Sequence, residues 1–269
     1  MVSKNRPYIS VSGASVASEA KEVGLMMREC GLRRDRGIMP AQGIQVSYKC
    51  LDHGFSEGNR RVPFFSDLPE LLDSMRDHAL PIIHYYTKKD FALVSELTMV
   101  MEYRNIYSSG KVHGVQINGV FPRPGDIEAI KEIYPKLNVI LQLHPEDGSE
   151  ARLAKSLSAE YKSVDYLILD YSQGKGKGID IGKMVDLEKV LRDSGVEAGI
   201  VYSGGIHGGN VETVVKKLRD ARGGCDFSID AEGGLRDRIG DGYGNDTMNL
   251  KKVRAYLEGA VRAFGALYP

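Results

Sequence analysis

The chain has 269 residues, with 36 lysines and arginines against 36 aspartates and glutamates, so its formal net charge is zero. This balance argues against a generally basic nucleic-acid binder and against a polybasic protein of the membrane surface. A hydrophobic content of 42% with 27% charged residues is typical of a folded protein and excludes a disordered one. Glycine accounts for 31 of the 269 residues, a larger share than the ~7% of an average protein. The excess glycines lie mainly between Gly174 and Gly244.

The termini and the cysteines indicate the compartment. No apolar run approaches the ~18 residues that cross a bilayer, and the first residues contain no apolar signal region. The three cysteines, Cys30, Cys50 and Cys225, are scattered and form no CxxC motif. We therefore expect a cytoplasmic protein with reduced thiols, no disulfide framework and no structural zinc.

Short apolar or β-branched runs alternate with helical patterns along the whole chain. The expected strands are Tyr8–Ser12, Gly43–Tyr48, Pro81–Tyr86, Val112–Asn118, Asn138–Leu143, Val164–Asp170, Ala198–Tyr202 and Asp226–Asp230. They are apolar almost throughout, as in a parallel sheet that is covered on both faces.

Between the strands, apolar residues recur at the spacing of a helix that is buried on one side. The clearest sets are Leu68, Leu71, Leu72 and Met75; Phe91, Val94, Leu97 and Met101; Val211, Val214, Val215 and Leu218; and Leu250, Val253, Leu257, Val261 and Phe264. Ser15, Ser66 and Asp147 precede three helices and are the expected N-caps.

Eight strand–helix units without a linker or repeat predict an α/β fold, a single (β/α)8 TIM barrel that spans residues 1–269 as one domain. A doubly wound open sheet is the alternative, although it usually has fewer units at this length. Barrels place their chemistry at the carboxyl ends of the strands and in the loops that follow. The longest irregular segment, Cys50–Phe65, is therefore a candidate active-site loop.

Paired glycines follow the last two expected strands. We expect Gly204, Gly205, Gly233 and Gly234 to bind phosphate, because glycine lets the backbone approach an anion closely and barrels commonly hold phosphate after strands 7 and 8. Tight turns without a ligand are the alternative. A third cluster, residues 174–178, carries Lys175 and Lys177 and is either a loop that closes over an anionic substrate or a solvated loop.

These motifs resemble the phosphoribosylanthranilate isomerase family of the tryptophan pathway. The family's VQLHG resembles Val115–Gly119, its LLD and GGTGKxFDW resemble Ile168–Asp170 and Gly174–Ile181, its SGGLxPENV matches Ser203–Val211, and its DVSSGVE resembles Asp230–Arg236. The resemblance is good from the third strand to the end and weak before it.

The resemblance implies an Amadori-type isomerisation of a phosphoribosyl adduct. Such chemistry needs an acid for the ring oxygen, a base for the C2 proton and a phosphate anchor. By resemblance, Asp170 is the general acid. The substrate-binding residues that it implies, or for which this chain has approximate counterparts, are Arg61, Gln116, Asn118, Lys177, Asp230, Glu232 and Arg236.

The chain departs from the family where the base is needed. The family's base is a cysteine that ends the first strand, and here Ser12 stands in its place. A serine hydroxyl is far too weakly acidic to supply the anion that a cysteine supplies. Cys50 and His53 are candidate substitutes. The family's arginine after the second strand has only approximate counterparts in Arg60 and Arg61.

Three hypotheses follow. The first is a phosphoribosylanthranilate isomerase-like enzyme with Asp170, Ser12 and Cys50 as its catalytic residues. The second is a divergent barrel that keeps the phosphate site and acts on another sugar phosphate, with Asp170, Glu232 and Cys50 or His144 as acid and base. The third is a non-catalytic protein that binds a phosphometabolite. We expect a phosphorylated small molecule as ligand, a monomer or homodimer, and no cofactor, metal, nucleic acid or membrane partner.

Overall fold

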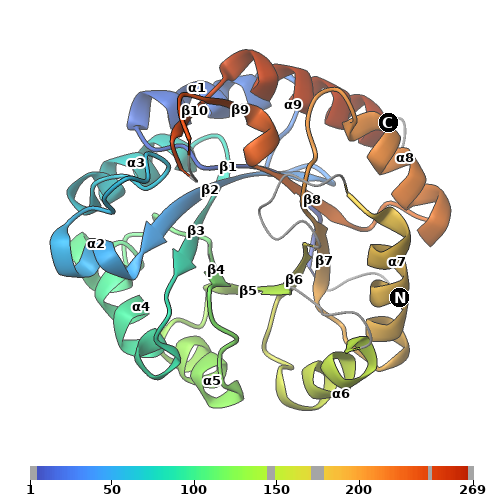
Figure 1. Cartoon of the computed structure of the whole chain (residues 1–269), viewed down its shortest axis with the longest axis horizontal. Helices are drawn as coiled ribbons and strands as arrows, with labels where there is room; N and C mark the ends of the chain where they lie inside the picture. The colour runs from blue at the N-terminus through green and yellow to red at the C-terminus, as the bar shows by residue number, and fades with distance from the viewer. Residues whose placement is uncertain (1–4, 144–148, 171–178, 242–243, 266–269) are drawn as a thin grey trace.

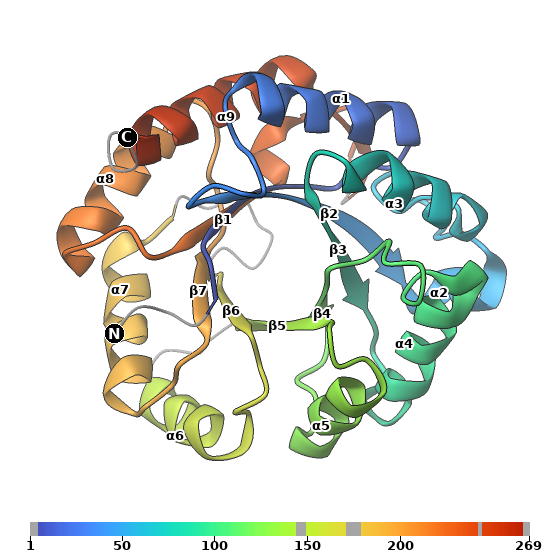
Figure 2. The ribbon, with the colours of Figure 1, turned by 180° about the vertical axis from the view of Figure 1, so that it is seen from behind.

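Within residues 5–143, 149–170, 179–241 and 244–265, which the computed structural model describes, eight parallel strands close into a barrel. Each strand pairs with its neighbour in chain order, and β1 pairs with β8 to complete the ring. The helices form an outer layer around the strands, which Figures 1 and 2 show from the two ends of the barrel. The predicted (β/α)8 TIM barrel is therefore confirmed, and the open doubly wound sheet is wrong.

The strands are β1 (Tyr8–Ser12), β2 (Met39–Ser47), β3 (Leu80–Tyr86), β4 (Gly114–Asn118), β5 (Asn138–Leu143), β6 (Tyr166–Leu169), β7 (Gly199–Tyr202) and β8 (Ser228–Ala231). The helices are α1 (Ala17–Glu29), α2 (Tyr48–His53), α3 (Leu68–Arg76), α4 (Leu93–Glu102), α5 (Pro124–Ile133), α6 (Glu150–Glu160), α7 (Ile181–Asp193), α8 (Val211–Arg222) and α9 (Leu250–Gly265). Short 3₁₀ helices are η1 (Phe65–Asp67), η2 (Asp90–Ala92), η3 (Tyr103–Asn105) and η4 (Gly233–Leu235).

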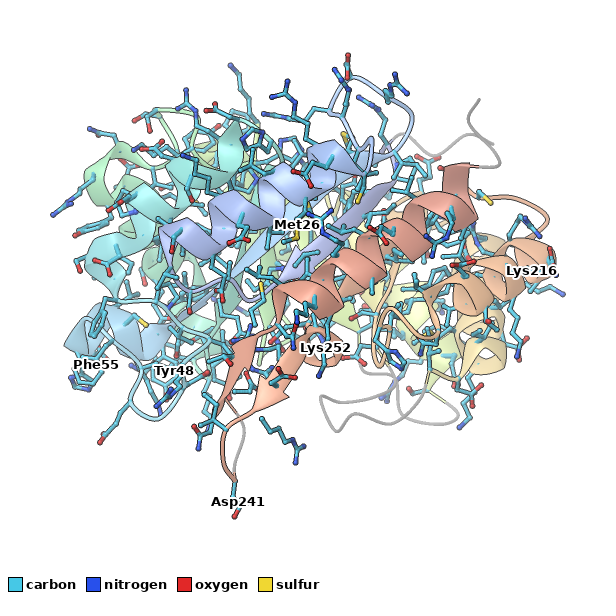
Figure 3. The ribbon with its side chains drawn as sticks, turned by 90° about the horizontal axis from the view of Figure 1, so that it is seen from above. Met26, Tyr48, Phe55, Lys216, Asp241 and Lys252 are labelled. Atoms are coloured by element: carbon cyan, nitrogen blue, oxygen red, sulfur yellow. The ribbon has the colours of Figure 1, made fainter. Side chains whose placement is uncertain are left out.

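An antiparallel hairpin follows β8 and η4. It pairs β9 (Arg236–Arg238) with β10 (Asp246–Met248) and was not expected from the sequence. In Figure 3 it projects beyond the body of the barrel, with Asp241 at its far end. Its base lies directly after the carboxyl end of β8, so the hairpin belongs to the end of the barrel where chemistry is expected.

The helices bury the faces that their apolar spacing predicts, with one exception. The expected residues of α3 and α8 are all buried. Phe91 is wrongly placed, because it lies in η2 before α4 and is 76% exposed, while Leu93 and Leu97 begin the buried face of α4. The helix therefore starts two residues later than its apolar spacing suggests.

Other details of the sequence prediction also need correction. α1 and α3 begin after Val16 and Asp67, each one residue beyond the expected N-caps Ser15 and Ser66, and the expected N-cap Asp147 lies outside the described residues. The segment Cys50–Phe65 was expected to be an irregular loop, but its first residues belong to α2. This helix ends at His53, and Gly54 caps it in a left-handed conformation with φ 77°.

The barrel interior changes character along its axis. A compact apolar cluster fills the end where the strands begin, and its members are Tyr8, Met39, Ala41, Leu80, Ile82, Ile140, Tyr166, Ile168 and Val201. Because side chains alternate between the two faces of a strand, the inward positions that follow are Ser10, Ser12, Gly43, His84, Gln142, Asp170 and Asp230. The interior is therefore apolar where the strands begin and polar where they end, and we call this polar end the mouth.

Candidate active site

Asp230 and Ser12 form a buried polar contact in the mouth. Ser12 Oγ donates a hydrogen bond of 2.6 Å to Asp230 Oδ1 and lies 3.4 Å from Ser10 Oγ. The register of β1 against β8 places Ser10 beside Asp230, which explains why both serines reach one carboxylate. Burial raises the pKa of Asp230 to about 6, against the opposing effect of the serine hydrogen bonds, and the negative charge of Asp170 adds to the rise.

Asp170 lies just past the end of β6, where a chain of amides holds it. Gln142 Nε2 donates to Asp170 Oδ2 at 3.1 Å, and Gln116 Nε2 donates to Gln142 Oε1 at 3.1 Å. Asp170 is 6% exposed. Since the charge of Asp170 contributes to the raised pKa of Asp230, the two carboxyl groups belong to one site. The predicted residues Asp170, Asp230, Ser12 and Gln116 are therefore brought together.

The glycine-rich loops after β7 and β8 lie against each other. Gly204 and Gly205 have φ values of 100° and 69°, a left-handed region that favours glycine. A Cβ on Gly234 would lie 2.5 Å from the carbonyl oxygen of Ile206, so only glycine allows η4 to approach the β7 loop this closely. Gly233, by contrast, has no atom within 4 Å of such a Cβ.

The same loops border open space and offer unused donors. No described residue accepts a hydrogen bond from the backbone N–H of Gly204 or Gly205. A hollow of about 350 Å³ opens next to Gly234, between the β7 loop and α9, and is lined by His207, Gly208, Gly209, Gly234, Lys252 and Ala255. Lys252 itself is engaged, because its Nζ donates to the carbonyl oxygen of Arg236 and pairs with Asp237.

A buried network of opposite charges closes one side of the mouth. Arg61 pairs with Glu232 and with Asp246, each at 2.5 Å, and Arg236 Nε pairs with Asp246 at 2.5 Å. Gln45 Nε2 also donates to Glu232 Oε1 at 2.6 Å. Burial raises the pKa of Asp246, but the hydrogen bonds and charges of the two arginines outweigh it and hold that pKa below its ordinary value.

This charged network ties the hairpin to the segment after α2. The backbone N–H of Arg60 donates to the carbonyl oxygen of Gly244 at 3.0 Å, and Arg236 Nη1 donates to the carbonyl oxygen of Gly13 at 2.8 Å. The predicted substrate-binding residues Arg61, Glu232 and Arg236 thus lie at the mouth. In this structure their charged groups neutralise one another and Asp246.

Several other predicted residues lie elsewhere or have other partners. Cys50 is buried in α2 near Tyr85, whose hydroxyl donates to Glu96 of α4 in the layer outside the barrel. Burial raises the pKa of the Cys50 thiol, which disfavours the thiolate that a base requires. Asn118 uses its Oδ1 to accept the backbone N–H of Gly119 at 2.7 Å. His53 is exposed, and Lys175, Lys177 and His144 lie outside the described residues.

Sequence reasoning missed part of the site. Gln142 and Gln45 follow the same inward alternation as their neighbours, and a polar residue near the end of an apolar strand was the available signal. Asp246 had no signal, because it reaches the mouth through the unexpected hairpin. His84 lies on the inner face of β3 with 8% exposure, and its place within the expected strand Pro81–Tyr86 was the available signal.

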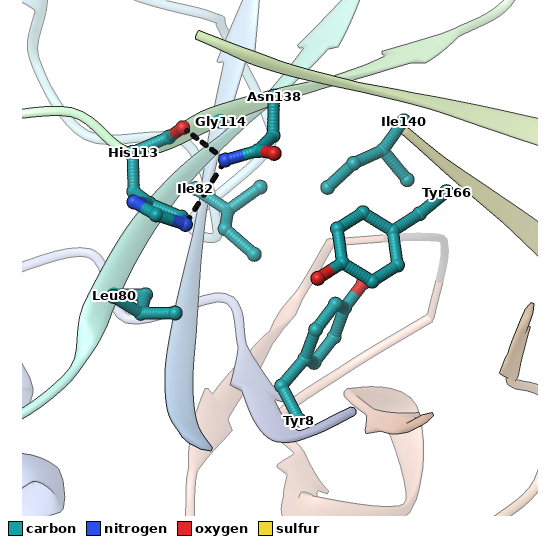
Figure 4. Close-up of a pocket in the computed structure, with 8 residues that line it drawn as sticks. All are labelled: Tyr8, Leu80, Ile82, His113, Gly114, Asn138, Ile140 and Tyr166. Atoms are coloured by element: carbon teal, nitrogen blue, oxygen red, sulfur yellow. Dashed lines mark hydrogen bonds between the residues drawn. The ribbon is translucent and has the colours of Figure 1, made fainter. Parts of the chain in front are cut away.

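A small cavity of about 10 Å³, about one water in size, lies at the opposite end of the barrel. Figure 4 shows the edge-to-face pair of Tyr8 and Tyr166, with ring centroids 5.2 Å apart, and the contact between Asn138 and His113. In barrels of this kind, packing at the end where the strands begin stabilises the fold. Across the described residues, no cluster of three His, Cys, Asp or Glu side chains suits a metal ion, and no helix there is long and apolar enough to span a membrane.

Comparison with known proteins extends these findings. No protein-family model matches the chain, and no curated protein is similar to it in sequence. Its structure is similar to phosphoribosyl anthranilate isomerase from Thermus thermophilus, with a TM-score of 0.61 and 16% identity over 95% of this chain and 98% of that one. The isomerase from Pyrococcus furiosus gives a TM-score of 0.57 and 15% identity over 96% and 100% of the two chains.

Solved structures with other names give TM-scores in the same range. A Rubisco-like protein from Rhodopseudomonas palustris gives a TM-score of 0.59 and 11% identity over 98% of this chain and 65% of that one. Identities this low establish the fold and leave the reaction open. The resemblance that the sequence motifs indicated is therefore confirmed as a shared barrel fold: phosphoribosylanthranilate isomerases are among the structures that this chain resembles over nearly its whole length.

Proposed function

We propose that this protein is an isomerase that moves a proton within a phosphorylated sugar adduct, with Asp170 and Asp230 as its acid–base pair. The observation that carries the proposal is the raised pKa of Asp230, about 6, at a buried position where Asp170 acts on it electrostatically. A carboxyl group with a pKa near the working pH both accepts and releases protons efficiently.

The pair supplies what an Amadori-type isomerisation requires. One group protonates the ring oxygen as the sugar opens, and the other removes the proton from C2. The motif resemblance assigns the first role to Asp170, which leaves the second to Asp230. Ser12 is not the base in this proposal, because its hydroxyl donates a hydrogen bond to Asp230. Ser12 instead positions the carboxylate of Asp230.

The glycine loops supply the anchor for the phosphate group. The N–H groups of Gly204 and Gly205, which have no acceptor among the described residues, are suited to bind an anion. The approach of Gly234 to Ile206 keeps the β7 and β8 loops together at that position. Barrel enzymes commonly bind phosphate at these two loops.

The charged network favours a second candidate substrate. In the first candidate, phosphoribosylanthranilate, the family's arginine holds the substrate carboxylate, and Arg61 is the approximate counterpart. Here Arg61 already binds Glu232 and Asp246. A substrate carboxylate has to displace one of them, so a phosphorylated sugar adduct without that carboxylate fits this network better.

Turnover assays test the proposal. Purified protein is assayed with phosphoribosylanthranilate and with other phosphorylated ribosylamines, and Asp170→Asn and Asp230→Asn are each expected to lower kcat by about 10²–10⁴-fold. Asp165→Asn is the matched control, since Asp165 lies before the start of β6 and binds Lys131 at 2.8 Å. Full activity of both mouth variants excludes this acid–base pair, and thermal stabilisation by phosphate esters without any turnover favours a non-catalytic binding protein.

A further inference from the structure

His84 is a buried polar residue that the acid–base pair leaves unused. It lies on the inner face of β3, between Ile82 in the apolar cluster and the rim, and is 8% exposed. Its imidazole makes no hydrogen bond with any described residue, and Gln42 Oε1 is the one fully buried side-chain polar atom among them without a partner, so the ring nitrogens of His84 reach open space. Because these nitrogens open into the mouth and have no protein partner there among the described residues, a ligand that enters the mouth can bind them.

Gly43 allows His84 to approach the centre of the mouth. The register places Gly43 beside Ser12 on β1, and both residues face inward. A Cβ on Gly43 would lie 2.4 Å from His84 Nε2 and 2.4 Å from Ser12 Oγ, so the imidazole and the hydroxyl gather where a side chain is missing. The φ angle of Gly43 is not in the left-handed region, so space rather than backbone conformation requires glycine here.

The charge state of His84 defines what it offers. Burial lowers the pKa of His84 to about 4, and the negative charge of Glu232 opposes this only in part. The ring is therefore neutral at physiological pH, with one N–H donor and one acceptor nitrogen. The hydroxyl of Ser12 donates its hydrogen bond to Asp230, so Ser12 Oγ presents only lone pairs to its other neighbours.

We propose that His84 is a further catalytic residue, which donates a hydrogen bond from its neutral imidazole to a sugar oxygen of the substrate next to Ser12, and that Gly43 is the position that admits it. This inference rests on the proposed function, because it assigns a ligand to the same mouth. His84 keeps its proton throughout. It holds and polarises the oxygen, while Asp170 and Asp230 move the protons.

Two probes distinguish recognition of the sugar from recognition of the phosphate. Ribose 5-phosphate, which carries both groups, and inorganic phosphate, which carries one, are titrated into the wild-type protein by calorimetry. We expect ribose 5-phosphate to bind at least about 10-fold more tightly than phosphate. His84→Ala is expected to remove most of that preference and to leave the affinity for phosphate unchanged. His84→Gln, which retains a side-chain N–H donor, is expected to restore part of it.

His113→Gln is the matched control, because His113 lies at the opposite end of the barrel and contacts Asn138. It is expected to bind both probes as the wild type does. A second measurement, which needs no variant to fold, follows the ¹⁵N resonances of the wild-type imidazoles. Ribose 5-phosphate is expected to shift those of His84, and inorganic phosphate is not.

The possible failures are distinguishable. If the wild type prefers ribose 5-phosphate and His84→Ala keeps that preference, or if the His84 resonances do not move, the inference is overturned and the proposed function stands. If the wild type binds both probes with equal affinity, the sugar contact is overturned and the phosphate site stands. If the wild type binds neither probe, the proposed function fails and the inference fails with it.

Discussion

Asp230→Asn is expected to make the protein more stable at neutral pH while it damages the active site. Burial raises the pKa of Asp230 to about 6, compared with about 3.9 in an unfolded chain. The pKa of this group is therefore about two units higher in the folded state than in the unfolded state, and each unit makes ionisation in the folded state less favourable by about 1.4 kcal/mol. Folded wild-type protein thus loses about 3 kcal/mol of stability when Asp230 ionises, and the asparagine variant does not.

The sign follows from the raised pKa. The protonated carboxyl contributes its stability fully below about pH 4, and that contribution is lost as the pH rises from about 4 to about 6. The free energy of unfolding of Asp230→Asn minus that of the wild type should therefore increase by about 3 kcal/mol between pH 4 and pH 7. Urea denaturation followed by circular dichroism at several pH values measures this difference. A difference that stays constant across this range refutes the electrostatic reasoning.

Asp246→Asn provides a control with the opposite sign. Although burial opposes it, the contacts with Arg61 and Arg236 lower the pKa of Asp246, so its contribution to stability is present above its unfolded pKa and is lost as the pH falls through the folded value. This variant should be destabilised at pH 7, and the deficit should diminish below about pH 4. If the two variants respond to pH in the same direction, global effects of substitution dominate and the assignment is wrong.

The remaining predictions concern the loops of the mouth. Arg61→Ala removes the partner that buried Asp246 and partly buried Glu232 share, while Arg236 still pairs with Asp246 and Gln45 still donates to Glu232. It is expected to lower the free energy of unfolding by about 1–3 kcal/mol, measured by urea denaturation; a loss below about 0.5 kcal/mol contradicts a stabilising network. Gly234→Ala places a Cβ 2.5 Å from a backbone oxygen and should weaken phosphate binding at least about 10-fold by calorimetry, whereas Gly233→Ala has open space and should bind normally. Equal affinities of the two glycine variants argue against this packing.

The resemblance and the glycine pattern predicted a site at the strand ends, and the structure changed how its residues are expected to work. Asp170, Asp230 and Ser12 were expected at strand ends and do meet at the mouth. Glu232 was expected as an acid or base in one hypothesis, but it accepts from Arg61 and Gln45. Ion pairing of this kind depends on which loops meet in space, and a strand-end motif contains no information about that.

The sequence by itself determined the barrel. Eight apolar runs with helical spacing between them can bury both faces of their strands only in a parallel sheet covered by helices. Eight strand–helix units are the number that closes such a sheet into a barrel. Local patterns of this kind are read within each segment, so the strands appeared close to where the structure has them. The exceptions were element ends, such as β2, which starts at Met39 rather than Gly43, because end residues are set by pairing with neighbours.

Only the tertiary structure decided the electrostatics of the site. The raised pKa of Asp230 comes from burial and from the charge of Asp170 beyond β6, while hydrogen bonds from two serines of β1 oppose the rise, and these groups come from segments far apart in the chain. The approach of His84 to Ser12 needs the missing side chain of Gly43 on the strand between them. Residue type and spacing predict which groups reach the mouth. Desolvation and pairing, which fix their charge and their free donors, exist only once the strands have closed.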